Sequence, residues 1–314
     1  MINSKTIKAE KFMLLISLIR QFKVIMLLLI TSGSSFALER PNEIPIMLLG
    51  ETEVYSIVND PDYIVDDASM IKIWDGILTY AHPKLTPIYQ HMSLTRSWVE
   101  ISKIPNACMI NKIKNTERES IGIFSKYPFS IFPPIRLIAL EKNQFKFKQP
   151  FSLAELHKQN IQIGVAKSRS YGYEIDKFIK QNPEYFFIRG AEDSMSKLID
   201  MLMKERIDAI IDFSQIVIAH KLEMAQLQPI ISIPLIEAPE PILSYVVCSK
   251  SDQGQAIIDI INESYQTQEV REIFQRFHYH YFGEKELALL QPIIDGIFLS
   301  PEELQTQGEI TNIF

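Results

Sequence analysis

The sequence predicts an α/β protein of two units, with the second unit inserted into the first. Strand and helix patterns alternate regularly from residue 151 onward, which is typical of a doubly wound, mainly parallel sheet with flanking helices. Two polar or proline-rich segments, 141–149 and 238–241, are suited to cross between the units. The length of 314 residues, 46% of them hydrophobic, leaves room for two globular units of ordinary size.

The first unit is expected on both sides of the insert, at 41–140 and 243–285. Its predicted strands are short apolar or alternating runs at 44–49, 107–113, 119–124, 136–140 and 245–248. Its predicted helices have apolar residues at helical spacing and cover 70–79, 255–265 and 269–277. Residues 89–96 predict a strand or a strand-like arm, and the weakly patterned residues 286–314 are expected to form a C-terminal tail.

The inserted unit is expected at 148–240. Ser152 and Glu155 have the spacing of a capping box, which predicts a helix start. Strands and helices then alternate, with strands at 161–166, 185–188 and 207–213 and helices at 173–179, 195–203 and 216–222. Residues 230–236 then lead into the second crossing segment. A protein of two α/β units joined by crossings offers a cleft, where ligands commonly bind.

The first 37 residues resemble an export signal. Basic residues accompany two short apolar stretches, 12–19 and 24–30, and Ser35 and Ala37 are small residues suited to a signal peptidase. The expected location is the periplasm, with a soluble chain after cleavage; an uncleaved membrane anchor is the alternative. Removing 1–37 takes away five basic residues and one acidic residue, which leaves 27 and 37 and a net charge of −10.

Composition excludes several functional classes. The 11 glycines include no G-x-G, and no G-x-x-x-x-G-K-[ST] occurs, so neither nucleotide-binding motif is present. The net charge of −6 argues against nucleic acid as a partner. The six histidines form no H-E-x-x-H and there is no C-x-x-C, so no metal and no cofactor is expected. Trp74 and Trp98 could line a pocket, although core packing is the expected use of each.

The two cysteines, Cys108 and Cys248, would lie in an oxidising compartment after export. Sequence spacing alone leaves two readings open. They pair, or they are two separate buried thiols.

Three segments resemble a known family. Thr116-Glu117-Arg118, followed by an apolar run and Ser125, Tyr127 and Pro128, is similar to a stretch of the family 3 periplasmic solute-binding proteins. The residues from Phe151 to Leu156 with 161–171, and Glu205 to Ala209, resemble the opening and a later motif of that family's second lobe. The likeness covers most of 41–283 and is closest to a divergent subgroup.

The resemblance implies a type II two-lobed binding fold that closes around a small solute. Arg118 matches the arginine that grips a ligand carboxylate through two hydrogen bonds. Ser168 and Ser170 lie in the turn that offers amides and hydroxyls to an anion. Arg96 and His91 belong to a segment typical of the subgroup and are further candidates. No catalytic residue is implied.

The sequence departs from the family pattern at two positions that bear on the identity of the ligand. Amino-acid binders of the family hold the ligand ammonium with an aspartate at the position that Phe213 occupies here. Asp212 is the nearest carboxylate and stays in the candidate set, although strand alternation would point it to the other face. Lys167 stands where the family has glycine in the binding turn. An α-amino-acid ligand is therefore not secured.

The expected function is that of a non-enzymatic, monomeric binding protein. It would capture a small anionic solute for a membrane permease or sensor, with carboxylate-bearing solutes as the candidate class. The resemblance also places Cys108 and Cys248 on strands of lobe one that could be neighbours, which favours a disulfide. The alternative function is a periplasmic lyase or dehydratase-like enzyme on the same scaffold, with Glu51, His91 and Asp212 as its candidate acid–base groups.

Overall fold

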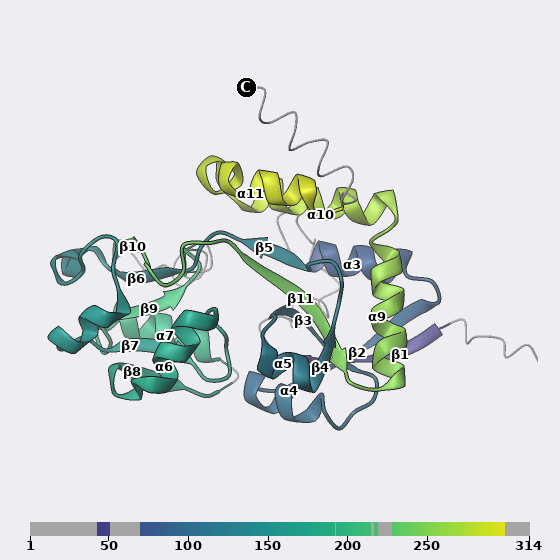
Figure 1. Ribbon diagram of the computed structural model, residues 1–314, viewed down its shortest axis with the longest axis horizontal. Helices are drawn as coiled ribbons and strands as arrows, with labels where there is room; N and C mark the ends of the chain where they lie inside the picture. The colour runs from purple at the N-terminus through teal and green to yellow at the C-terminus, as the bar shows by residue number, and fades with distance from the viewer. Residues whose placement is uncertain (1–42, 51–69, 192, 215–216, 219–227, 299–314) are drawn as a thin grey trace, which may run out of the picture. The chain divides into compact units, whose positions relative to one another are not determined.

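The structure, a computed structural model, describes residues 43–50, 70–191, 193–214, 217–218 and 228–298. The predicted leader, Glu51, most of the predicted helix 216–222 and residues 299–314 lie outside the described residues. The described chain forms two β-sheets with flanking helices, which confirms the α/β class (Figure 1). None of the helices in these ranges is long and apolar enough to cross a bilayer.

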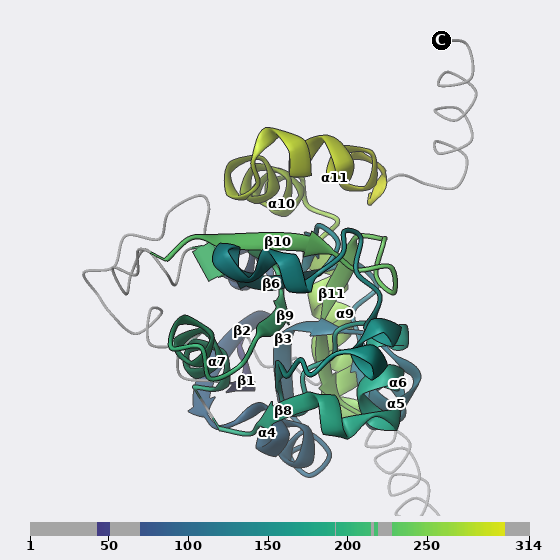
Figure 2. The ribbon, with the colours of Figure 1, turned by 90° about the vertical axis from the view of Figure 1, so that its left-hand side faces the viewer.

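The first sheet has six strands among the described residues, in the order β2-β1-β3-β11-β4, with β5 paired to β11. They are β1 (Glu43–Gly50), β2 (Lys84–His91), β3 (Ala107–Ile113), β4 (Gly122–Phe124), β5 (Ser130–Phe132) and β11 (Ile242–Ser249). Its helices are α3 (Ile71–Tyr80), α4 (Leu94–Glu100), α5 (Thr116–Ile121), α9 (Asp252–Ser264), α10 (Gln268–Tyr281) and α11 (Glu284–Gly296). Helix α9 packs along β11, and α10 lies beside α11 (Figures 1 and 2).

The second sheet has five strands in the order β10-β6-β9-β7-β8 within the described ranges. They are β6 (Arg136–Leu140), β7 (Ile163–Ala166), β8 (Phe186–Arg189), β9 (Ala209–Asp212) and β10 (Ile230–Pro234). Helices α6 (Tyr173–Gln181) and α7 (Ser194–Met203) connect its parallel strands, and three 3₁₀ helices complete it: η1 (Glu141–Lys146), η2 (Leu153–Lys158) and η3 (Pro183–Tyr185). Figure 2 shows β6 and β10 side by side, as their antiparallel pairing requires.

Both sheets contain the same arrangement of three parallel strands. Strand β1 pairs with β2 and β3, and β7 pairs with β8 and β9. Parallel neighbours need a crossover connection, which α3 and α4 provide in one sheet and α6 and α7 in the other. The remaining pairs, made by β6, β10 and β11, are antiparallel, so the sheets are mixed rather than mainly parallel.

Strand β6 lies in the second sheet, where it pairs with β9 and β10. The sequence predicts that the first part of the first unit ends at residue 140, which would place this strand in the first unit. Local sequence does not show which sheet this apolar strand joins, because its partners are about 70 to 100 residues further along the chain. The first crossing therefore precedes β6, and η1 follows it within the same unit.

Two local predictions were wrong because side-chain caps start helices there. Residues 119–124 do not form one strand, because the Asn115 side chain accepts a hydrogen bond from the Arg118 amide (2.9 Å) and starts α5. Residues 89–96 do not form one strand either. Strand β2 ends at His91, and Ser93 caps α4 through the Arg96 amide (3.4 Å).

The first part of the predicted tail is helix α11, which continues to Gly296. Pro292 lies inside this helix and weakens the helical signal in the sequence. Leu290 and Ile294 are fully buried, so tertiary packing holds the segment.

Close packing of α7 on β7 depends on Gly164. A Cβ atom at this position would lie 2.6 Å from Ile207 Cδ1 and 2.8 Å from Leu198 Cδ2. Glycine therefore lets the helix approach the strand that ends at the candidate site described below.

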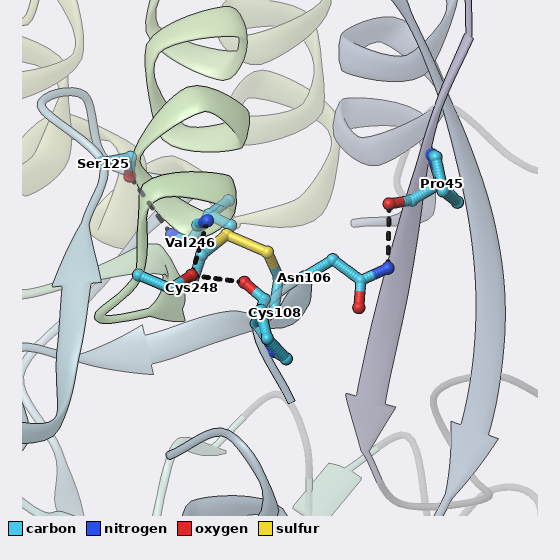
Figure 3. The surroundings of a disulfide bond; sticks show 9 residues. Pro45, Asn106, Cys108, Ser125, Val246 and Cys248 are labelled. Carbon is cyan, nitrogen blue, oxygen red and sulfur yellow. Dashed lines mark hydrogen bonds between the residues drawn. A yellow bond between two sulfur atoms is a disulfide. The ribbon is translucent and has the colours of Figure 1, made fainter. Parts of the chain in front are cut away.

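Cys108 and Cys248 form a disulfide, which confirms the pairing that the family resemblance favoured (Figure 3). The two residues face each other on β3 and β11, and both are fully buried. Beside them the Val246 amide donates a hydrogen bond to Ser125 Oγ (3.2 Å), which ties β11 to the end of β4. The disulfide joins positions 140 residues apart, so it restricts the unfolded chain strongly. A disulfide of this kind typically stabilises a fold by about 2–4 kcal/mol.

His278 is a buried, neutral histidine near the end of α10. Its Nε2 accepts a hydrogen bond from the Ile131 amide (2.9 Å), and its Nδ1–H donates to the Phe274 carbonyl (2.7 Å). The first bond needs an unprotonated nitrogen. Burial lowers the pKa of His278 to about 4, although the bond to Phe274 opposes this effect.

We expect this histidine to make the protein sensitive to acid. Between about pH 6.5 and 4 the unfolded chain binds a proton that the folded chain refuses, so stability falls as the pH falls through this window. The total loss is about 3 kcal/mol, at 1.36 kcal/mol for each pKa unit. In urea unfolding at pH 7 and pH 4, His278→Gln should reduce the loss by about this amount. The exposed His280→Gln should not, and an unchanged loss in His278→Gln would contradict this role.

Candidate functional site

Two chain segments that follow parallel strands meet at the candidate site. The turn from Lys167 to Tyr171 follows the carboxyl end of β7, and Asn115 to Arg118 follows the carboxyl end of β3. Strands β7 and β9 are neighbours, and the chain leaves β7 for β8 on one side and leaves β9 for β10 on the other side. Such switch points at the carboxyl ends of parallel strands are where α/β sheets bind ligands.

Arg118 is the central cation of this site. It is only 8% exposed. Its Nη1 donates to the Ile113 carbonyl (2.8 Å) and its Nη2 donates to the Ser168 carbonyl (2.9 Å). The Trp98 ring lies 4.7 Å from the guanidinium carbon, which gives a cation–π contact. Within the described residues, no carboxylate forms an ion pair with Arg118.

Burial lowers the pKa of Arg118 to about 10, against the attraction of Asp176 and Glu117. Arg169, a second cation, adds to the lowering. The side chain therefore stays charged at neutral pH, and a buried charge of this kind is stabilised by an anionic partner.

The turn after β7 has a left-handed residue at Ser168, with φ of 64°. This conformation is uncommon outside glycine and is often found at functional sites. The backbone of Lys167 is not left-handed. The lysine that stands at the family's glycine position therefore fits this turn without backbone strain.

The second half of the turn is held by Asp176 of α6. One Asp176 oxygen accepts a hydrogen bond from the Tyr171 amide (2.7 Å), and the other accepts a short one from the Ser170 hydroxyl. Burial raises the pKa of Asp176, although both bonds and Arg118 oppose this. The Tyr171 hydroxyl oxygen accepts from the Ala166 amide (2.7 Å), which fixes the start of the turn. Side chains of the turn and of α6 therefore order this segment together.

A cavity of about 410 Å³ lies between these segments, a size that suits a small solute. Apart from residues already described, its walls include apolar side chains of α5, α6 and β8 and the charged residues Glu117, Lys167, Arg169 and Lys180. Beside the cavity, Thr95 of α4 forms a hydroxyl–hydroxyl hydrogen bond with Ser168 (2.9 Å). Helices α4 and α5 and the turn after β7 thus contact one another directly.

Asp212 lies behind the cavity wall. It is fully buried at the end of β9, and Arg169 Nη2 donates to its Oδ1 (2.7 Å). The same oxygen accepts from the Phe213 amide (2.8 Å). Burial raises the pKa of Asp212, and Arg169 opposes this. Phe213 stacks on Phe132 at 4.4 Å, so the residue at the family's aspartate position packs against an aromatic ring.

The candidates predicted from the sequence are not all in one place. Arg118, Ser168 and Ser170 line the same cavity, and Asp212 reaches it through Arg169. Arg96 and His91 are not among the lining residues. Arg96 lies on the outer side of α4 in an ion pair with Glu100 (3.6 Å), and its side chain is 69% exposed.

Sequence reasoning missed Asp176 and Thr95 and expected core packing for both tryptophans. Trp74 lies in the core, at 1% exposure. Trp98 is partly buried against a core cluster and also contacts Arg118 at the cavity. A carboxylate in the first turn of a helix is an ordinary capping residue, so Asp176 gave no distinct signal in the sequence. The described residues contain no group of three or more His, Cys, Asp or Glu side chains suited to a metal.

Neither a family model nor a curated protein matches this sequence. Solved structures do match its fold. A histidine kinase sensor domain with similarity to periplasmic binding proteins superimposes with a TM-score of 0.59 at 8% identity, covering 78% of this chain and 98% of that chain. An ABC uptake transporter substrate-binding protein from Streptococcus pneumoniae, with bound histidine, gives 0.56 at 14% identity and covers 78% and 94%.

A further Streptococcus pneumoniae structure, an amino acid ABC transporter substrate-binding protein bound to L-arginine, gives a TM-score of 0.54 at 12% identity and covers 74% and 91%. The chain has the type II periplasmic-binding fold. This confirms the fold that the sequence resemblance implied. At these identities the likeness is one of fold, and the type II fold alone does not specify a ligand.

Proposed function

We propose that this protein is a periplasmic substrate-binding protein that captures a small, carboxylate-bearing anion in the cavity beside Arg118. The observation that carries the proposal is the state of Arg118. It is a buried cation whose guanidinium, among the residues that the structure describes, is hydrogen-bonded to two backbone carbonyls and stacked on Trp98. A ligand carboxylate is the natural counter-charge for such a group, because it can accept two parallel hydrogen bonds.

The turn after β7 supports the same role. The Ser168 carbonyl occupies one Arg118 donor in this structure. A ligand carboxylate would replace this neutral acceptor with a charged one, and charge-assisted hydrogen bonds are about twice as strong as neutral ones. The contacts of Ser168 with Thr95 and Arg118 support a role for the turn in covering the bound group.

The partner in the membrane would be a transporter permease or a sensor. The fold matches with amino acid ABC transporter proteins favour the permease, and the match with a histidine kinase sensor domain supports the second choice. The monomeric state, the periplasmic location and the export signal remain parts of this proposal.

A lyase or dehydratase-like enzyme has less support. Such chemistry needs an acid–base group at the reacting atoms. Neither His91 nor Asp212 lines the cavity, and Asp212 is committed to Arg169 and the Phe213 amide. The solved structures reported above are binding proteins or a sensor domain.

The proposal is tested by a search for the solute. The protein is exported, purified from periplasm and examined by native mass spectrometry for a retained small molecule. The unfolded and refolded protein is then screened by thermal shift against carboxylic acids, amino acids, neutral sugars and polyamines. We expect carboxylates to stabilise the protein. Stabilisation by sugars or polyamines alone, or conversion of a bound acid to a product, would contradict the proposal.

A further inference from the structure

The charges around the cavity do not balance. Four of its lining residues are basic, namely Arg118, Lys167, Arg169 and Lys180, and two are acidic, Glu117 and Asp176. Clefts lined by an excess of one charge concentrate ligands of the opposite charge. One of these charges is already neutralised within the protein.

Two of the charged groups are already committed. Arg169 is paired with the buried carboxylate of Asp212, which offsets its charge. Asp176 accepts hydrogen bonds from Ser170 and Tyr171 with its two oxygens, so it serves the turn. Arg169 therefore adds nothing to the excess, whereas Asp176 keeps its negative charge, which attracts Arg118.

The excess lies with Arg118 and two lysines at the cavity mouth. Lys167 and Lys180 line the cavity and are exposed, and neither forms an ion pair with the described residues. Glu117, also exposed, is the second acidic group on this wall beside Asp176. Arg118, Lys167 and Lys180 thus carry three positive charges against two negative ones, with one cation deep in the wall and two at the mouth.

We propose that the solute carries two acid groups. This inference rests on the proposed function, in which one acid group binds Arg118. The second acid group lies toward Lys167 and Lys180, where it keeps part of its water. Each lysine would form a solvent-exposed charge pair with it, and the two together should favour a second negative charge by roughly tenfold in affinity.

Acids and their monoamides test the second charge without changing molecular shape. The probes are glutarate against glutaramate, and L-glutamate against L-glutamine, titrated by calorimetry into the refolded full-length mature protein. In at least one pair, we expect the diacid to bind about tenfold more tightly than its amide at low salt, with a smaller ratio at high salt because exposed charges are screened.

Helix α6 carries two exposed lysines, Lys180, which lines the cavity, and Lys177, which serves as the control. The double variant Lys167→Met with Lys180→Met should bring the acid-to-amide ratio close to one. Lys177→Met should leave the ratio unchanged, because Lys177 lies on α6 without lining the cavity. All three positions are exposed, so these variants should fold as the parent does.

The outcomes separate this inference from the proposed function. Equal binding of acid and amide, or a ratio that survives the double lysine variant, overturns the second charge but leaves carboxylate binding at Arg118 in place. Failure of both diacids to bind, while a solute with a single acid group does, also overturns it. If no carboxylate of any kind binds, the proposed function itself is wrong.

Discussion

Replacing Arg118 with methionine should weaken binding of a carboxylate solute by at least about 100-fold. The side chain would supply two charge-assisted hydrogen bonds to the ligand, each contributing roughly 1.5–3 kcal/mol. Even the lower value gives about 3 kcal/mol, or a factor of roughly 100 in the dissociation constant. Calorimetric titration of parent and variant with the solute found in the screen measures the difference.

Two further variants test whether the effect depends on the paired N–H donors of the Arg118 guanidinium. Arg118→Lys keeps the charge but not the paired donors, so it should recover only part of the affinity. Arg276→Met removes an exposed arginine of α10 and should change nothing. Because Arg118 also bonds the Ile113 carbonyl, urea unfolding of each variant must accompany the titration. Full affinity in a folded Arg118→Met protein would rule out the assigned role.

The second large effect is expected at Arg169. Its replacement by methionine leaves the Asp212 carboxylate fully buried without its counter-charge. Removing one partner of a buried ion pair typically costs about 3–5 kcal/mol. We expect a loss toward the lower end of this range, since the Arg169 side chain is 25% exposed. Urea unfolding at pH 7 measures it.

The pH dependence of this loss gives an independent check. Without Arg169, burial raises the pKa of Asp212 further, so the folded state holds a proton that the unfolded chain releases. The variant should therefore lose stability relative to the parent as the pH rises from 4 to 7. Adding Asp212→Asn removes the buried charge and should restore most of the stability. A double variant as unstable as Arg169→Met would contradict the ion-pair explanation.

Much of the fold could be predicted from local patterns. The strands β7, β8 and β9 and the helices between them follow apolar runs and helical spacing that the sequence displays directly. These patterns are strong because parallel strands are buried on both faces. The sheet to which β6 belongs could not be predicted in this way, since its partners β9 and β10 are distant in the sequence.

Short elements held by tertiary contacts were also missed. Helix α5 has six residues and depends on the Asn115 cap and on the buried Arg118. Intrinsic helix propensity is too weak to reveal a helix of this length. Helix α11 carries Pro292 and is held by the buried side chains of Leu290 and Ile294.

The candidate site also contains some residues that could be predicted from the sequence and others that could not. Arg118, Ser168 and Ser170 lie in segments whose family likeness is visible in the sequence, and the fold brings them to one cavity. Trp98 and Asp176 come to that cavity from α4 and α6 and are not among the residues that carry the family likeness. The Arg169–Asp212 pair depends on the juxtaposition of β7 and β9, which only the assembled sheet provides.

The central claim is that Arg118 holds an acid group of the solute. A crystal structure of the protein with its retained or screened solute tests this most directly. We expect a carboxylate within hydrogen-bond distance of both Arg118 Nη atoms, with the bond from Nη2 to the Ser168 carbonyl replaced. A bound solute with no acid group at Arg118, and with the bond to the Ser168 carbonyl intact, would contradict the account.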